Sequence, residues 1–138
     1  MKRQIYYYDT DCGGVVYHAN YLNFFEEART EALSKVGLTV QKFKEEGCFI
    51  VVNHQEIFYK YPAFYGDVLD VQAKAVELTP IRVVFEYEVK NQNDRLLSYG
   101  STSLVCVDAN GRPKPWPKYV SEKIILHTKR ENTKGAKK

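Results

Sequence analysis

The chain has 138 residues, of which 44% are hydrophobic and 27% charged, a composition typical of one soluble globular domain. No apolar run reaches the roughly 18 to 20 residues that span a bilayer, and the basic start lacks the apolar segment of a secretory signal, so we expect a cytoplasmic protein. The net charge of +3 comes from residues 129–138, which hold five basic side chains and one acidic one, so residues 1–128 carry −1. This balance argues against nucleic-acid binding by the body and predicts one domain over 1–128, followed by a basic, disordered tail over 129–138.

The first half of the chain predicts a strand followed by a long helix. Residues 2–8, KRQIYYY, are rich in β-formers and end at the turn-prone sequence DTDCGG. We place the helix N-cap at Asn20 and its end at Gly37, a typical C′ residue. Residues 39–47 predict a short second helix. Apolar residues recur along the long helix at steps of three and four, at Leu22, Phe25, Ala28, Ala32, Leu33 and Val36.

The second half of the chain predicts four strands joined by short turns. Such turns favour antiparallel neighbours. Alternation within 82–90 places Val83, Phe85, Tyr87 and Val89 on one face of the sheet, which a single helix would cover. The expected fold class is therefore α+β, with one long helix against a largely antiparallel five-stranded sheet. The four strands are expected at 48–60, 67–78, 82–90 and 96–108.

The edges of such a sheet predict self-association. One helix covers only one face, and a five-stranded open sheet has two unpaired edges that a second subunit can cover. We expect at least a homodimer. The three cysteines, Cys12, Cys48 and Cys106, are odd in number and lack metal-ligand spacing, so we expect reduced thiols and no metal.

The most informative local pattern is the pair Asp9 and Asp11, which precedes Gly13-Gly14 and the predicted helix start. A helix N-terminus presents unpaired amides and a partial positive charge, which stabilise developing negative charge. A carboxylate facing those amides across a small gap could act as nucleophile or general base on a bound carbonyl. The alternative is that both residues serve only the turn, for which Asp is well suited.

Other chemistries at this segment have weaker support. A Mg²⁺ or Ca²⁺ site lacks the further oxygen ligands that such a cation needs. His18 could act as a base, but it has no second ligand nearby and is better suited to orienting the loop or offering its backbone amide. Cys12 has no assignable His and Asn or Asp partners, so a cysteine nucleophile is disfavoured.

Three segments resemble a known family. The pattern D-x-D-x-x-G-V-V-Y-H-A-N-Y within 6–33 resembles the opening of hotdog-fold thioesterases of the 4-hydroxybenzoyl-CoA thioesterase family, especially the Tol-Pal-associated acyl-CoA thioesterases. FIVVNHQEIFYKYPAFYGDVL over 49–69 is similar to the second strand and P-x-x-x-G-D turn of that family. LVCVDANGRPKPWP over 104–117 resembles its last strand. The resemblance implies a hotdog fold, in which the sheet wraps the helix and active sites form at the dimer interface.

The resemblance also implies roles for individual residues. The catalytic aspartate of the family matches Asp11, and the backbone amide that polarises the carbonyl matches His18. The turn and the substrate-binding segment between them consist of Gly14, Val15, Val16 and Tyr17. Contacts to the phosphates of coenzyme A are implied for Arg82, Arg112 and Lys114.

The function implied is hydrolysis of an acyl-CoA thioester to a carboxylic acid and free CoA, without cofactor or metal, by a homodimer or homotetramer. An acyl-carrier protein could present the acyl group in place of CoA. Two alternatives stay open. One is a hotdog acyl-thioester dehydratase, and the other is a non-catalytic module that binds acyl-CoA or acyl-carrier protein, with the basic tail as a docking arm.

Overall fold

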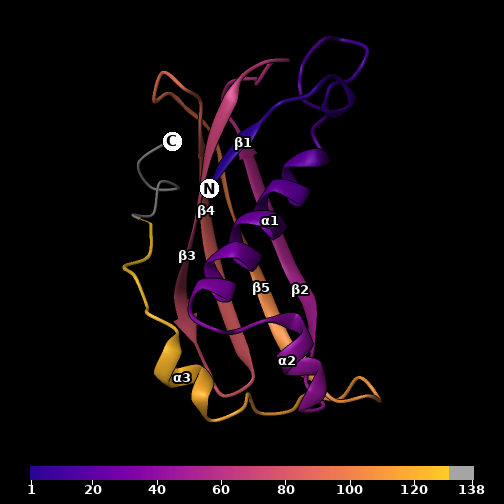
Figure 1. Ribbon diagram of the computed structural model, residues 1–138, viewed down its shortest axis with the longest axis vertical. Coiled ribbons are helices and arrows are strands. Elements are labelled where there is room, and N and C mark those ends of the chain that lie inside the picture. The colour runs from indigo at the N-terminus through magenta and orange to yellow at the C-terminus, as the bar shows by residue number, and fades with distance from the viewer. Residues whose placement is uncertain (131–138) are drawn as a thin grey trace.

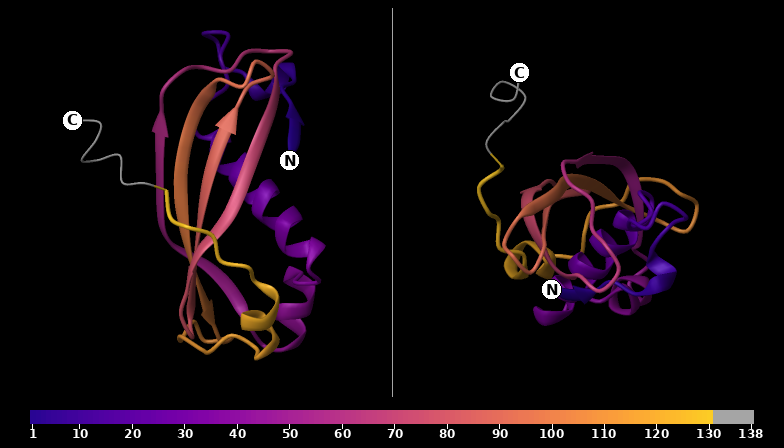
Figure 2. Two further views of the ribbon diagram at one scale, coloured as in Figure 1. Left: turned by 90° about the vertical axis from the view of Figure 1, so that its left-hand side faces the viewer. Right: turned by 90° about the horizontal axis from the view of Figure 1, so that it is seen from above.

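A five-stranded antiparallel sheet curls around one long helix (Figures 1 and 2). The computed structural model describes residues 1–130. The predicted α+β hotdog architecture is confirmed. The elements in chain order are β1 (Lys2–Gln4), the 3-10 helix η1 (Tyr7–Asp9), α1 (Asn20–Lys35), α2 (Val40–Glu45), β2 (Phe49–Tyr59), β3 (Val68–Leu78), β4 (Arg82–Lys90), β5 (Leu96–Val107) and α3 (Tyr119–Lys123).

The strand order across the sheet is β1-β3-β4-β5-β2, and every neighbouring pair is antiparallel. The short strand β1 therefore forms one edge, and the 11-residue strand β2 forms the other. The four longer strands agree with their predicted ranges to within one residue at each end. The short turns after β3 and β4 reverse the chain beside itself, as predicted. The link from β2 to β3 does not make these two strands neighbours, because β2 pairs with β5 at the far edge of the sheet.

The core lies between α1 and the concave face of the sheet. The predicted alternation of β4 is confirmed, since Val83, Phe85, Tyr87 and Val89 are all buried on that face. Phe25 of α1 stacks on Tyr87, with ring centroids 4.1 Å apart. Because glycine lacks a side chain, Gly100 allows this packing: a Cβ there would lie 3.0 Å from Phe25 and 2.3 Å from the backbone oxygen of Glu56.

Two predicted boundaries at the N-terminal end are wrong. The first strand stops at Gln4 rather than continuing to residue 8, because the tyrosine run turns into η1. The helix N-cap is Ala19, and Asn20 is already the first helical residue. The Asn20 side chain donates to Asp9 and accepts from the side chain of Asn23, so this residue, although typical of an N-cap, is used for a tertiary contact. The predicted second helix is confirmed, with Thr39 as its N-cap.

The expectation of reduced thiols is wrong for two of the three cysteines. Cys48 and Cys106 form a disulfide, with Cα atoms 5.8 Å apart. The odd cysteine count gave no sign of this pair, because only the pairing of β2 with β5 brings the two residues together. Both are buried in a second apolar cluster with Leu38, Phe43 and Val120. Cys12 is an exposed free thiol, as expected.

The C-terminal segment after α3 runs along the free part of β3 and onto the convex face of the sheet (Figure 2). The His127 amide donates to the carbonyl oxygen of Ala75. Lys129 pairs with Glu77, and the Arg130 guanidinium lies over the ring of Tyr99. Residues 131–138 of the predicted tail lie outside the described residues. No helix in the described part of the chain is long and apolar enough to cross a membrane.

Candidate active site

Asp11 begins a tight hairpin turn that precedes α1. The hairpin is closed by the Asp11 amide, which donates to the carbonyl oxygen of Val15 at 2.8 Å. The Gly14 amide donates to the Asp11 carbonyl oxygen at 3.0 Å, and Gly14 has φ of +85°, a value that favours glycine. The Asp11 side chain is exposed, and its Oδ1 accepts a hydrogen bond from the Gly13 amide at 2.8 Å. Within residues 1–130, its Oδ2 has no hydrogen-bond donor.

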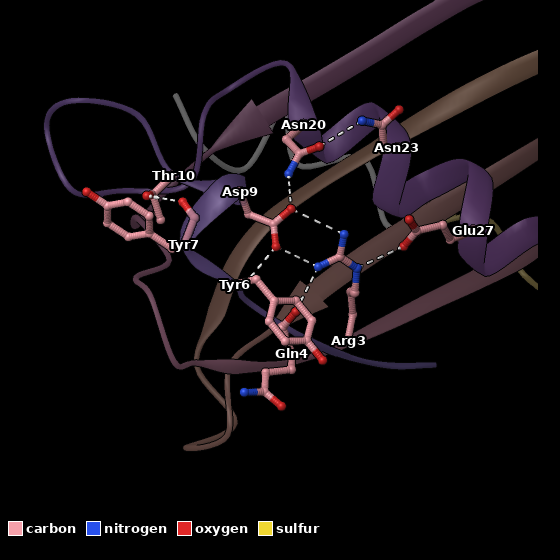
Figure 3. A network of polar contacts seen from close by, with 9 residues as sticks. All are labelled: Arg3, Gln4, Tyr6, Tyr7, Asp9, Thr10, Asn20, Asn23 and Glu27. Carbon is pink, nitrogen blue, oxygen red and sulfur yellow. Dashed lines mark hydrogen bonds and ion pairs between the residues drawn. The ribbon is translucent and has the colours of Figure 1, made fainter.

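Asp9, by contrast, is the centre of a buried polar network (Figure 3). Its carboxylate accepts hydrogen bonds from the Arg3 guanidinium at 2.7 Å and 3.2 Å, from the Tyr6 amide at 2.9 Å and from the Asn20 side chain at 2.8 Å. Arg3 also pairs with Glu27 of α1 at 3.2 Å. Of the two candidate carboxylates, Asp9 is thus fully occupied in joining β1, η1 and α1, whereas Asp11 has a free oxygen.

The ionisation of Asp9 follows from this network. Burial alone would raise the pKa of its carboxyl, but the hydrogen bonds from Arg3, Tyr6 and Asn20 favour the ionised form and lower the pKa below its ordinary value. Asp9 therefore stays ionised and paired at neutral pH.

The start of α1 is fixed by hydrogen bonds on both sides of His18. The Tyr17 amide donates to the carbonyl oxygen of Asp9 at 3.0 Å, and the Asn20 amide donates to that of Tyr17 at 2.9 Å. The Tyr59 hydroxyl donates to the His18 carbonyl oxygen at 2.8 Å. The backbone amide of His18 has no acceptor in the part of the chain described. Its imidazole is exposed and lies against the ring of Tyr17, with centroids 4.5 Å apart.

The hairpin is also fastened to the loop between β2 and β3. Val16 is buried, and its amide donates to the carbonyl oxygen of Ala63 at 2.9 Å. Val15 forms an isolated bridge with Phe64. These contacts lie between Asp11 and His18, so the segment from Gly14 to Tyr17 is held between the carboxylate and the helix start. One end of the molecule therefore brings together six of the predicted site residues: Asp11, Gly14, Val15, Val16, Tyr17 and His18.

The three basic residues implied for phosphate binding lie at the opposite end of the same chain. Arg82 begins β4, and Arg112 and Lys114 lie in the segment after β5, at the end where α1 finishes (Figure 1). Arg82 pairs with Glu77, and the Lys114 ammonium donates to the carbonyl oxygens of Glu46 and Gly47. The Arg112 side chain is exposed. A single chain does not bring these residues to Asp11.

The surface beside the Asp9 network does not suit a phosphate group. A hollow of about 650 Å³ runs along the outer side of α1. Its lining includes Glu26, Glu27 and Glu31, and Arg3 is already paired, so anionic groups would be repelled. Among residues 1–130, no group of three His, Cys, Asp or Glu side chains is arranged to hold a metal ion.

Sequence reasoning missed Tyr59, which contacts the His18 carbonyl oxygen from β2. The only sequence signal was its place just before the P-x-x-x-G-D turn, and that position does not specify the direction of its hydroxyl. The residues by themselves also left open which of the two aspartates was free to react, because the contact between Arg3 and Asp9 joins β1 to η1; only the family resemblance pointed to Asp11.

Three comparisons with known proteins identify the family of the chain. A profile of the thioesterase-like superfamily matches residues 6–124. The acyl-CoA thioesterase YbgC of Haemophilus influenzae is 41% identical over 120 residues, covering 85% of this chain and 87% of its own. A 1,4-dihydroxy-2-naphthoyl-CoA thioesterase from Synechocystis superposes with a TM-score of 0.84 at 29% identity, covering 90% and 93% of the two chains. A Thermus thermophilus thioesterase crystallised with coenzyme A and Zn gives a TM-score of 0.77 at 27% identity, covering 90% and 89%. The chain therefore belongs to the thioesterase-like superfamily, as a thioesterase of the hotdog fold.

Proposed function

We propose that this protein hydrolyses acyl-CoA thioesters, with Asp11 as nucleophile or general base and the backbone amide of His18 as the donor to the thioester carbonyl. The observation that carries the proposal is that one segment holds both an exposed carboxylate oxygen without a donor and an amide without an acceptor, among the described residues. The hydrogen bond from the Tyr17 amide to the Asp9 carbonyl oxygen, which ties the helix start to the segment before Asp11, supports the proposal. The proposal that the thioester is one of coenzyme A is supported by the relatives described above, two of which are acyl-CoA thioesterases.

Two chemical routes use the same residues. In the first, Asp11 Oδ2 attacks the carbonyl carbon, the C–S bond breaks, CoA leaves as thiolate, and water hydrolyses the resulting mixed anhydride. In the second, Asp11 accepts a proton from a water molecule that attacks the carbonyl directly. Both routes develop charge on the carbonyl oxygen, and the loss of one preorganised donor at such an oxygen costs roughly 2.7 to 4 kcal/mol in other enzymes. A thiol has a pKa of about 8.5, so it leaves without a dedicated general acid.

A second subunit would supply the phosphate-binding residues. Strand β2 is a long free edge, and Val51 and Val52 on it are 43% and 50% exposed. If two copies pair antiparallel along β2, the end of one chain that carries Asp11 lies beside the opposite end of its partner, where Arg112 is exposed. A homodimer of this kind brings together site residues that a single chain keeps apart.

The direct test is thiol release from a panel of short, long and aromatic acyl-CoAs by the wild type and by Asp11→Asn. Asparagine keeps the acceptor for the Gly13 amide but can neither attack nor take a proton, so we expect kcat to fall at least about 100-fold with the fold unchanged. The matched control is Asp94→Asn, the same change at an exposed turn residue.

Full activity of Asp11→Asn would rule out the proposed mechanism. Formation of an enoyl thioester without free thiol would indicate a dehydratase. Binding of acyl-CoA with no turnover by the wild type would indicate a binding module.

A further inference from the structure

The hydroxyl of Tyr59 reaches the start of α1 from the last residue of β2. It donates to the His18 carbonyl oxygen at 2.8 Å, across 41 positions of sequence. Tyr59 thereby connects the free edge strand of the sheet with the residue that the proposed function assigns to carbonyl binding. The hydrogen bonds that close the Asp11 hairpin do not involve β2.

The hydrogen bonds around His18 fix the two peptide groups on either side of it. The first peptide group holds the carbonyl of Tyr17 and the amide N–H of His18, and the Asn20 amide binds that carbonyl. The second holds the carbonyl of His18 and the amide N–H of Ala19, and Tyr59 binds that carbonyl. In residues 1–130 neither of these two N–H groups has an acceptor. A hydrogen bond accepted by a peptide carbonyl polarises the group and strengthens its own N–H as a donor.

The Tyr59 side chain is itself held in place. Its ring packs edge-on against the buried ring of Tyr21 in the first turn of α1, with centroids 5.4 Å apart and planes at 78°. Burial raises the pKa of its phenol above the ordinary value, so the hydroxyl stays protonated at neutral pH. The hydroxyl is therefore a fixed, permanent donor.

We propose that Tyr59 is a positioning residue for carbonyl activation: through the His18 carbonyl it polarises the Ala19 amide and fixes its direction beside the His18 amide, so that both amides can donate to the substrate oxygen. The inference rests on the proposed function and extends it in two ways: it assigns Ala19 as a second donor, and it makes the oxygen-binding amides depend on a residue of β2. Tyr59 acts through the backbone and does not itself meet the reacting atoms.

The test compares Tyr59→Phe with Tyr65→Phe. Both substitutions remove one hydroxyl from a partly exposed tyrosine. Tyr65 is 66% exposed, and in the part of the chain described its hydroxyl has no hydrogen-bond partner. Loss of one positioning hydrogen bond predicts that kcat for the best acyl-CoA of the panel falls about tenfold in Tyr59→Phe, with KM unchanged. Tyr65→Phe should match the wild type in both constants.

A spectroscopic measurement separates positioning from a general loss of stability. The acyl-CoA, labelled with ¹³C at the thioester carbonyl, is bound to Asp11→Asn and to the double variant with Tyr59→Phe, and the C=O stretch is read by isotope-edited infrared difference spectroscopy. Polarisation by the two amides lowers the stretching frequency. We expect a smaller lowering in the double variant. Incorporation of 4-aminophenylalanine at position 59, which restores a donor, should restore kcat.

The outcomes distinguish this inference from the proposed function. If Asp11→Asn is inactive but Tyr59→Phe keeps the wild-type kcat and carbonyl frequency, only the role of Tyr59 is overturned. If kcat falls while the carbonyl frequency stays the same and 4-aminophenylalanine gives no rescue, the effect is merely structural and the inference is also wrong. If Asp11→Asn is fully active, the proposed function itself fails, whatever Tyr59→Phe does.

Discussion

The Arg3 guanidinium and the Asp9 carboxylate form a buried ion pair, with 2.7 Å between Nη1 and Oδ2. The same carboxylate binds the side chain of Asn20, the first residue of α1. Three elements that meet at the candidate site are therefore fixed to one another through a single charged group, which lies two residues before the catalytic candidate Asp11.

Replacement of Asp9 by Asn should destabilise the fold. Asparagine presents one acceptor oxygen where the carboxylate presented two, and it removes the buried one of the two charge partners of Arg3. Breaking a buried pair by removing one member costs about 3 to 5 kcal/mol. We expect a loss near the lower end of that range in urea unfolding, because Arg3 retains Glu27. Asp94→Asn at the exposed turn should leave the unfolding midpoint in place, and an equal loss there would contradict the assignment.

The same network predicts how stability depends on pH. The pKa of Asp9 is lower in the folded protein than its ordinary value of 3.8. Its contribution is therefore fully present above the unfolded pKa and is lost as the pH falls from about 3.8 through the folded pKa. Thermal unfolding across pH 2 to 6 should show an acid-side decrease that is shallower in Asp9→Asn. Parallel curves for the two proteins would show that another carboxylate is responsible.

Gly100 should not tolerate alanine. The added methyl group would lie 2.3 Å from the backbone oxygen of Glu56 and 3.0 Å from the Phe25 ring. The first contact involves backbone and cannot be relieved by a rotamer change, so we expect a loss of about 2 to 3 kcal/mol in unfolding free energy. Ser101→Ala, at the next position of β5 and on the opposite face, is the control and should lose little. Measured stability of Gly100→Ala equal to wild type would mean that the sheet shifts to make room.

The sequence was sufficient for those parts of the fold that follow from local patterns. The alternation in β4, the turns after β3 and β4 and the stop at Gly37 depend on neighbouring residues, and the structure agrees with them. The contacts that failed to be predicted are long-range. Cys48 pairs with Cys106 only because β2 lies beside β5, and Tyr59 reaches His18 only because the end of β2 lies beside the start of α1.

In the candidate site, too, the features that follow from local sequence were predictable and the long-range contacts were not. Residues 11–18 are contiguous, so their proximity follows from one hairpin turn, and the pattern at Asp11 and His18 was readable. The contact between Asn20 and Asp9 could not be predicted, because an asparagine at a helix start ordinarily indicates an N-cap. The basic residues Arg82 and Lys114 are engaged in contacts within the chain, which residue type alone does not reveal.

A charge on the free edge should separate the proposed dimer. Val51→Lys places an ammonium where two copies of β2 would meet, and its desolvation should weaken association at least about 100-fold. In light scattering the mass should fall from twice the chain mass of 16.0 kDa to the single value, with loss of thioesterase activity. Gln4→Lys, on the opposite edge strand β1, should leave the mass unchanged. A monomeric, active wild type would refute the dimeric site.

Arg112 should contribute to binding of the nucleotide part of the substrate. Its side chain is exposed, whereas Arg82 and Lys114 have partners within the chain. In Arg112→Ala we expect KM for acyl-CoA to rise about five- to tenfold with little change in kcat. The corresponding N-acetylcysteamine thioester lacks the phosphates, so its kinetics should not respond. Lys118→Ala, a nearby exposed cation, is the control. An equal effect on both substrates would place Arg112 at the acyl group instead.

The exposed thiol of Cys12 follows Asp11 directly in the hairpin, and this neighbourhood affects how the enzyme can be assayed and labelled. A chromogen that detects free CoA by its thiol will also modify Cys12, and it will attach a bulky group one residue from the proposed catalytic carboxylate of Asp11. Continuous assays therefore call for a Cys12→Ser background or for detection after quenching. The other two cysteines are buried and joined to each other, so a maleimide dye would label Cys12 alone. The fluorescence of that dye, next to Asp11, would then report substrate binding.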